Sequence, residues 1–294
     1  MDIIEQLSTA LADRIAAAGK SVVALRLGSR PRAGILWRPD VVVTSEQVVG
    51  ERDSVTIAHA GQECAARLAG RDPGTNVAVF RLEKPLTGTL PAAAGAPRVG
   101  SLALMVGATE AGAATGRLAM VHSVGPEWHS MAGGRIEALI RLDARLGADE
   151  GGLVLDHAGL LLGMSTSGPR RRVLVIPAAT IARVVDPLLE NGHIPRGWLG
   201  VGLQPVTIPE GLHEKAGQGR GAMVLNLVAD APADRAGVMA GDILLTVDGF
   251  AFGQNRRLTT ILRSERIGQS IEVRLLRAGE PKTVSVTIAA RPHA

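Results

Sequence analysis

The sequence predicts a mainly β protein of two domains, the first of them a barrel or sandwich. The first observation is a series of short apolar or alternating segments from Ser21 onward, separated by clusters of Gly, Pro and Asp. The second is that helix signals are nearly absent between residues 21 and 178. The third is a change of pattern after residue 197, where strand-like segments alternate with two helical stretches over a length that suits a small independent domain.

Two helices are expected in the first two thirds of the chain. Within residues 1–20, apolar side chains recur at helical spacing, at Ile3, Ile4, Leu7, Leu11 and Ile15. This amphipathic helix would either pack on the body or form an oligomer contact. The second helix is expected at residues 178–190, ended by Asn191 and Gly192. Because Pro187 falls inside it, we expect a kink or an early end.

The expected strands lie on both sides of a linker at residues 193–196. The first eight strands are expected at residues 22–27, 34–37, 41–44, 54–57, 77–82, 102–106, 117–122 and 136–142, and a hairpin follows them. The hairpin has strands at 152–155 and 160–164 around a turn at 156–159. Residues 193–196 form a linker. The last segment should contain strands at 199–203, 222–227, 243–247, 271–276 and 283–288, and helices at 232–236 and 257–264.

Composition excludes several classes of function. One cysteine, Cys64, cannot form an internal disulfide, and without clustered histidines we expect neither a metal site nor a cofactor. A buried structural thiol on a strand is the expectation for Cys64. No apolar run approaches the ~20 residues that span a bilayer. The net charge is +4, but the only basic run, residues 170–172, is typical of a solvated turn, and without aromatic stacking residues we expect no nucleic-acid binding.

The first twenty residues do not have the pattern of a signal peptide. They carry Asp2, Glu5, Asp13 and Arg14, and they contain no uncharged apolar stretch. If Met1 is the native start, the sequence predicts a cytoplasmic protein. If the N-terminus has been trimmed, the protein would be exported.

Several motifs occur in a fixed order along the chain. Residues 43–49, VTSEQVV, resemble T-x-x-H-V-V, and residues 72–82, DPGTNVAVFRL, resemble D-x-x-T-D-L-A-V-L-K-I. Residues 143–152, DARLGADEGG, resemble D-A-x-I-N-P-G-N-S-G-G with about one residue deleted. Residues 21–23, SVV, and residues 175–177, VIP, resemble the first strand and the end of the second barrel of the same family. The chain from Ser21 onward therefore resembles an HtrA-type protein.

This resemblance implies two six-stranded trypsin-like antiparallel β-barrels at residues 21–192, followed by a PDZ domain at residues 197–294. Residues 1–20 then form an N-terminal helix and residues 193–196 a linker. The resemblance also implies a homo-oligomer, with trimers as the family's usual assembly.

The catalytic residues of the family do not carry over. Gln47 stands where the motif has histidine, and an amide has no basic lone pair that could shuttle a proton near neutral pH. Asn76 stands where the motif has aspartate, and its amide lacks the charge that stabilises an imidazolium. Glu150 stands where it has serine, and its charge would oppose a developing oxyanion. With no catalytic residue intact, the sequence predicts a pseudoprotease and not an enzyme.

Other placements of a catalytic site were weighed. No serine lies between Ser130 and Ser165, so no shift of the alignment restores one near residue 150. His122 and Ser123 are neighbours on an expected strand and would point to opposite faces. His129 is expected in a loop and His157 in the hairpin turn. A separate hypothesis holds that backbone N–H groups of the turn at residues 149–152 bind the Glu150 carboxylate.

The C-terminal segment keeps its binding motif. Residues 196–201, RGWLGV, resemble the carboxylate-binding loop of PDZ domains in this family, where a glycine lets backbone N–H groups converge on a peptide C-terminus. Residues 231–238, 241–243 and 247–249 resemble the motifs that follow it. The expected peptide-binding residues are Trp198, Leu199, Gly200, Val201, Leu258, Ile261 and Leu262. For the last three, which should lie on a helix, core packing is the alternative.

Three functions follow from these patterns. The first is an inactive HtrA-like protein that binds C-terminal or unfolded peptide segments and acts as adaptor, regulator or holdase. The second is an active serine endopeptidase of protein quality control with a non-standard or misaligned site. The third is a regulatory subunit in mixed oligomers with an active paralogue.

Overall fold

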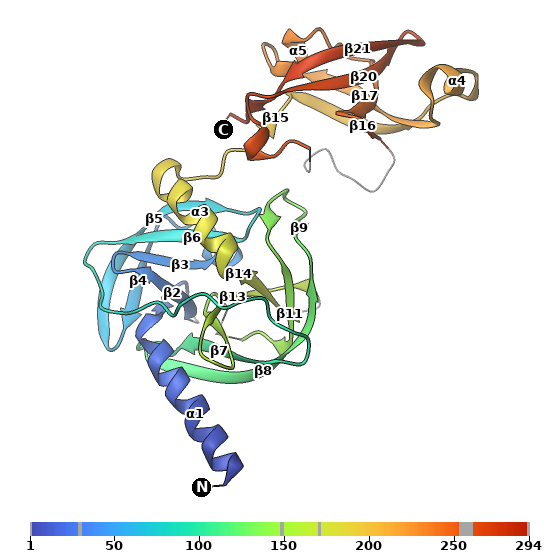
Figure 1. The fold of residues 1–294 in the computed structure, drawn as a ribbon. Coiled ribbons are helices and arrows are strands. Elements are labelled where there is room, and N and C mark those ends of the chain that lie inside the picture. The colour runs from blue at the N-terminus through green and yellow to red at the C-terminus, as the bar shows by residue number, and fades with distance from the viewer. Residues whose placement is uncertain (1, 29–30, 148–149, 170–171, 253–260, 293–294) are drawn as a thin grey trace. The chain divides into compact units, whose positions relative to one another are not determined.

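The computed structural model describes residues 2–28, 31–147, 150–169, 172–252 and 261–292. The chain divides into two compact units, Met1–Ile194 and Pro195–Ala294. Figure 1 shows the first unit as two barrels with helices α1 and α3, and the second as a smaller domain of strands β15 to β22. The mainly β fold class is confirmed.

The first barrel is a closed antiparallel sheet of six strands. Its order is β1-β2-β3-β6-β5-β4. The bounds are β1 Val22–Leu25, β2 Arg32–Arg38, β3 Val41–Ser45, β4 Ser54–His59, β5 Gln62–Asp72 and β6 Val77–Leu82. A short helix, α2 (Glu46–Val49), follows β3 directly. Cys64 on β5 is 8% exposed and points into the barrel core, as expected for a structural thiol.

The second barrel repeats this plan. Its order is β11-β14-β13-β12-β7-β8. The bounds are β7 Leu102–Ala108, β8 Ala114–Gly125, β11 Leu139–Arg145, β12 Leu153–Asp156, β13 Leu161–Ser167 and β14 Arg172–Pro177. The hairpin predicted around residues 156–159 is the β12–β13 hairpin. The expectation of two six-stranded antiparallel barrels is confirmed.

One apolar cluster joins the two barrels. It contains Val43 and Val79 of the first barrel together with Leu104 and Leu153 of the second, all of them fully or almost fully buried. Burying each such side chain contributes roughly 1.5–3 kcal/mol. The two barrels therefore share a core, which fixes the ends of β3 and β12 against each other.

The strand predicted at residues 136–142 was wrong in its extent. The chain instead forms a short ladder of β9 (Trp128–His129) and β10 (Arg135–Ile136), and β11 starts only at Leu139. Glu137 lies at the break, where its backbone N–H donates to Thr180 Oγ1 at 3.2 Å. A side-chain acceptor on helix α3 thus takes the place of a ladder hydrogen bond.

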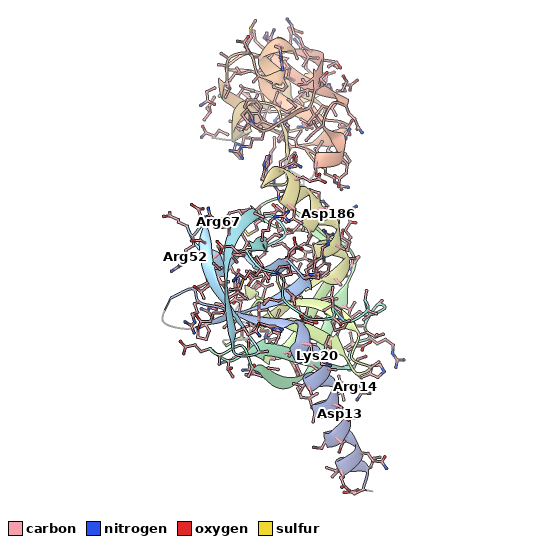
Figure 2. The ribbon with its side chains drawn as sticks, turned by 90° about the vertical axis from the view of Figure 1, so that its left-hand side faces the viewer. Asp13, Arg14, Lys20, Arg52, Arg67 and Asp186 are labelled. Atoms are coloured by element: carbon pink, nitrogen blue, oxygen red, sulfur yellow. The ribbon has the colours of Figure 1, made fainter. Side chains whose placement is uncertain are left out.

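Helix α3 (Ala178–Asn191) continues past Pro187, so of the expected kink or early end the early end does not occur. Pro187 lies inside the helix, and Gly192 ends it in a left-handed conformation, with its N–H donating to Leu188 O at 3.0 Å. A proline removes one helical hydrogen bond, but the fully buried side chains of Ile181, Val184 and Leu188 hold this helix on the barrels. Asp186, labelled in Figure 2, also forms an ion pair with Arg38 of β2, whose Nη1 lies 2.7 Å from Asp186 Oδ1.

Helix α1 (Ile3–Ala18) has the predicted bounds within two or three residues. Its second half packs on the body through Leu11 and Ile15. Its first half does not, because Ile3 and Ile4 are 77% and 70% exposed.

The second unit is built on a six-stranded sheet. Its order is β16-β17-β18-β20-β21, with β19 paired to β18, and β15 pairs separately with β22. The strand bounds are β15 Gly197–Trp198, β16 Val201–Thr207, β17 Arg220–Leu227, β18 Ile243–Val247, β19 Phe250–Ala251, β20 Ser270–Arg277, β21 Glu280–Thr287 and β22 Ala289–Ala290. Two short helices are α4 (His213–Ala216) and α5 (Pro232–Arg235).

The helix expected at residues 257–264 is only partly testable. Residues 257–260 lie outside the described residues, and residues 261–263 form a turn and not a helix. A 3-10 turn follows at Ser264–Arg266. Gly268, just after this turn, has a left-handed backbone conformation.

Glu137 makes a pH-dependent link between the second barrel and α3. Burial acts to raise the pKa of its carboxyl, but hydrogen bonds from Arg183 and Thr180 outweigh burial and lower that pKa below 4.5. The stabilisation is therefore complete above pH 4.5 and is lost as pH falls through the folded pKa. We expect Glu137→Gln to lower the free energy of unfolding by about 1–3 kcal/mol at pH 7.

Urea denaturation at several pH values tests this link. The gap between wild type and Glu137→Gln should narrow steadily below pH 4.5. Glu51→Gln, on an exposed turn residue, is the matched control and should change little at any pH. A gap that is the same at pH 7 and pH 3 would contradict the assignment.

Candidate functional site

The three positions singled out by the motifs lie together where the two barrels meet. Gln47 lies on α2 just after β3, Asn76 on the turn before β6, and Glu150 on the turn before β12. Gln47 Nε2 donates to Glu150 Oε1, and Gln47 N donates to Asn76 Oδ1 at 3.0 Å. The structure thus brings together side chains that are up to 103 residues apart.

The turn that carries Asn76 is shaped by a buried aspartate. Asp72 is 2% exposed, and its carboxylate accepts the backbone N–H groups of Gly74 and Thr75 at 3.0 and 3.1 Å. This Asx-type turn delivers Asn76 in a left-handed conformation with φ +57°. Asparagine and aspartate adopt that conformation more easily than other residues with a side chain.

Two hydroxyl groups close the cluster, and the motif comparison assigned neither of them a role. Asn76 Nδ2 donates to Thr166 Oγ1, which lies 3.1 Å from Ser45 Oγ, and Ser45 Oγ donates to Asn76 Oδ1 at 3.1 Å. Gln47 Nε2 also donates to Thr166 Oγ1 at 3.0 Å. Ser45 and Thr166 are fully buried. Ser45 could have been noticed inside the VTSEQVV motif, but nothing in the sequence links Thr166 to Asn76.

Glu150 is turned inward and held by donors from other segments. It is 8% exposed, and its Oε1 accepts the Ser167 N–H of β13 at 3.2 Å besides the Gln47 amide. Arg32 Nη1 lies 3.9 Å from Glu150 Oε2. The donors that described residues supply to this carboxylate come from β13 and α2, and the Gly151 N–H donates to Ser165 O. Asp149 lies outside the described residues, so binding of the carboxylate by the turn's own N–H groups stays a prediction.

The chemistry of this cluster follows from its groups. Two amides, two hydroxyls and one carboxylate satisfy one another in a closed set of hydrogen bonds. The serine, histidine and aspartate of a trypsin-like triad are absent from these three positions. Among the described residues of the cluster, the Glu150 carboxylate is the only group that could accept a proton, and the Gln47 amide separates it from the Thr166 hydroxyl.

The histidines considered as alternatives lie elsewhere. His122 is on β8, and its Nε2 is 3.3 Å from Arg172 Nη1. His129, expected in a loop, is instead in the short strand β9. His157 lies in the β12–β13 turn, as expected.

The expected peptide-binding loop of the second unit has an unusual backbone. Trp198 lies on β15, and Val201 begins β16, which is an edge strand of the sheet. Gly200 has φ +78°, and a Cβ there would lie 2.1 Å from Ala231 Cβ. Within the described residues, the N–H groups of Leu199 and Gly200 have no acceptor, whereas their carbonyls accept from Ala233 and Val228 at 2.9 Å.

Several of the expected peptide-binding side chains pack in the core of the second unit. Leu199 is 2% exposed and Ile261 is 7% exposed, and both belong to the core of the second unit. Leu262 is partly buried against the same core. Leu258 lies outside the described residues.

In the parts of the chain that the structure describes, no group of three or more His, Cys, Asp or Glu side chains is placed to hold a metal ion. No helix there is both long enough and apolar enough to cross a membrane.

Two protein families match the two units. The family described as Trypsin-like peptidase domain matches residues 32–164. The family described as PDZ domain matches residues 197–288.

The relatives are named serine endoproteases. A probable periplasmic serine endoprotease DegP-like of Brucella suis biovar 1 (strain 1330) is 30% identical over 263 residues, which is 86% of this chain and 51% of the relative. The protein of that name from Rhizobium meliloti (strain 1021) is 29% identical over 279 residues, 90% of this chain and 54% of the relative. The chain therefore spans about half the length of the curated relatives it matches.

Solved structures agree with the fold. The HtrA-type protease AlgW with tripeptide is 26% identical, covers 97% of this chain and 98% of its own, and has a TM-score of 0.68. A serine endoprotease from Yersinia pestis is 21% identical, with a TM-score of 0.68 over 96% of this chain and 98% of its own.

Two expectations are corrected by these comparisons. The relatives are named serine endoproteases, so the expectation that the chain is not an enzyme is contradicted, and the family points to protease activity. The same relatives are named periplasmic, so the expected cytoplasmic location is contradicted as well. The absence of a signal-peptide pattern in the first twenty residues was too weak a basis for a location.

Removing the Glu150 carboxylate should destabilise the contact between the barrels. Glu150→Ala would leave the Ser167 N–H and the Gln47 amide without their acceptor, at a cost of about 1–3 kcal/mol. Glu150→Gln keeps an acceptor oxygen and should lose less. Glu51→Ala, at an exposed turn position, is the control for chemical denaturation. Equal losses at residues 150 and 51 would contradict this role.

The two closed barrels, the PDZ-type second unit, the ordered motifs and the named relatives lead to one classification. The chain belongs to the HtrA-type family, with a trypsin-like peptidase fold followed by a PDZ domain.

Proposed function

We propose that this HtrA-type protein binds the C-terminal or unfolded segments of other proteins through its PDZ domain. The observation that carries the proposal is the backbone of the loop at Leu199 and Gly200. Two consecutive N–H groups there have no acceptor among the described residues, next to the edge strand β16. Such N–H groups suit a terminal carboxylate, and an edge strand suits an extended peptide.

The comparisons support this proposal. The structure neighbours include AlgW solved with a tripeptide and AlgW solved with a decapeptide. Binding of exposed C-termini would allow the chain to act as an adaptor, regulator or holdase. The expected homo-oligomer also remains a proposal, and the exposed Ile3, Ile4 and Leu7 on α1 support it.

Peptide binding by the full chain tests the main proposal. A peptide with a free C-terminal carboxylate should bind about tenfold or more tightly than the same peptide amidated, because amidation removes the charge that the loop N–H groups would receive. Gly200→Ala should weaken binding, since its new Cβ would meet Ala231 at 2.1 Å.

Gly237→Ala is the matched control for that substitution. Gly237 also has a positive φ, +77°, but no atom lies within 4 Å of its Cβ position. Fluorescence anisotropy measures both variants. Equal affinity for the free and amidated peptides would contradict carboxylate recognition.

A second candidate function is serine-type endopeptidase activity. The names of the relatives favour it, and the barrel scaffold that such an activity needs is complete. Because residue 150 has no hydroxyl, the nucleophile would have to be a serine at another position.

Casein turnover combined with fluorophosphonate labelling tests the endopeptidase function. If the chain is an endopeptidase, casein is cleaved and mass spectrometry places the label on a serine elsewhere than residue 150. A trypsin-like protease assayed in parallel shows that the probe reacts. If casein is not cleaved and no serine is labelled, this second function is excluded, and the proposal of peptide binding is not affected.

A further inference from the structure

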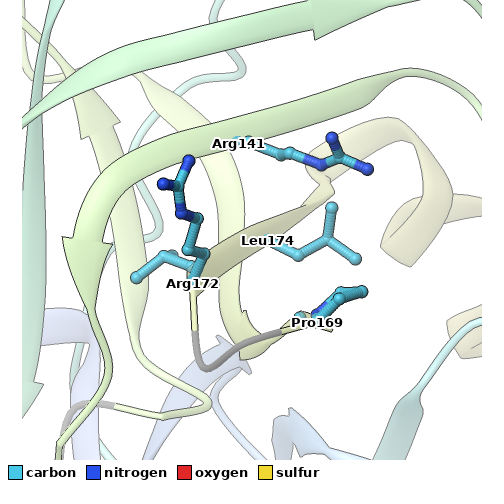
Figure 3. Close-up of a pocket in the computed structure, with 6 residues that line it drawn as sticks. Arg141, Pro169, Arg172 and Leu174 are labelled. Atoms are coloured by element: carbon cyan, nitrogen blue, oxygen red, sulfur yellow. The ribbon is translucent and has the colours of Figure 1, made fainter.

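A pocket on the second barrel is lined by two arginine side chains. It has a volume of about 290 Å³ and lies over strands β11 and β14. Its lining consists of Arg141, Gly168, Pro169, Arg172, Val173 and Leu174. Figure 3 shows Arg141 and Arg172 at two sides of the pocket, with Leu174 next to both and Pro169 below Leu174 in this view. Among the described residues, no acidic side chain belongs to this lining.

The positive charge of the pocket is not neutralised by the part of the chain that is described. Arg141 and Arg145 lie on β11, and Arg145 is the register partner of Arg172 on β14. Like charges directly opposite each other on neighbouring strands are destabilising. Within the described residues, none of these three guanidinium groups forms an ion pair.

The neighbouring polar groups leave that charge available. The Arg172 guanidinium lies 3.3 Å from His122 Nε2, and an imidazole ring brings no negative charge. Asp143, the carboxylate on β11, accepts the Met120 N–H at 2.8 Å. Arg117 donates to the Arg145 carbonyl.

We propose that this pocket binds the side-chain carboxylate of an acidic residue in a polypeptide segment. Arginine binds carboxylates through charge-assisted hydrogen bonds, and Leu174 and Pro169 provide an apolar wall for the carbon atoms of that side chain. The described residues that line the pocket include no aromatic side chain and so provide no surface on which nucleic-acid bases would stack. The site is on the first unit and does not depend on carboxylate recognition by the PDZ loop.

The position of the pocket fits a role beside the Gln47 cluster. Thr166 is the register partner of Leu174, and Leu174 is the register partner of Arg141. Neighbouring strands are about 4.8 Å apart, so two steps of the sheet separate the buried Thr166 from Arg141. A segment bound at the pocket would therefore lie next to the place where the two barrels meet.

Anisotropy with a pair of capped peptides tests the proposal on the full chain. Both peptides are acetylated and amidated, so that neither offers a terminal carboxylate to the PDZ loop, and they differ only in Asp and Glu against Asn and Gln. The acidic peptide should bind at least about tenfold more tightly. This preference should shrink at 1 M salt, where the Debye length is about 3 Å.

Variants locate the site. Arg141→Gln and Arg172→Gln should each weaken acidic-peptide binding about tenfold and leave the neutral peptide unchanged. Arg67→Gln is the control, because Arg67 is an exposed arginine on β5 of the first barrel (Figure 2). Circular dichroism and melting temperature confirm that the variants fold.

Three results would overturn the proposal. The first is equal binding of the acidic and neutral peptides, and the second is acidic-peptide binding that survives both arginine substitutions. The third is a single-stranded oligonucleotide that binds more tightly than the acidic peptide and loses affinity in the same variants, which would assign the pocket to nucleic acid.

Discussion

The close approach of Gly151 to the first barrel is the constraint on which the candidate site depends. At φ +88°, a Cβ on this residue would lie 2.3 Å from both Ala33 O and Thr44 Oγ1. Only glycine fits there, because it has no side chain and adopts positive φ without strain. Its N–H donates to Ser165 O at 2.8 Å, and Ala33 N–H donates to Glu150 O at 3.1 Å. These contacts place Glu150 within reach of Gln47, whose partner Asn76 is fixed separately by Asp72.

The polar side chains at the candidate site form hydrogen bonds with one another. In a triad, a base must take a proton from a nucleophile and pass it on, so at least one pair must be able to exchange it. Here Asn76, Thr166 and Ser45 form a ring in which each donor faces an acceptor. The carboxylate of Glu150 receives two donors and gives none. The strands and turns that meet between the two barrels thus position a hydrogen-bonded cluster of polar side chains.

Much of the architecture could be predicted from the sequence, because local patterns determine it. The β12–β13 hairpin and the strands at residues 77–82 and 243–247 follow from periodicity and turn residues alone. That Gln47, Asn76 and Glu150 lie close together could be predicted only from the order of the family motifs along the chain. The break at Glu137 and the continuation of α3 past Pro187 depend on Thr180, Arg183 and buried side chains that are remote in sequence. Thr166 and the Arg141 pocket depend on strand register, which no local pattern specifies.

The two proposed binding sites recognise carboxylates by different physical means. At Leu199 and Gly200 the donors are backbone N–H groups, so the loop conformation and not the side chains decides recognition. At Arg141 and Arg172 the donors are guanidinium groups on the neighbouring strands β11 and β14, so the charges of side chains decide recognition. A backbone loop of this kind selects a chain end, whereas an arginine pocket accepts an acidic residue anywhere along a chain. A polypeptide with an internal acidic residue and a free C-terminus therefore offers a group to each site.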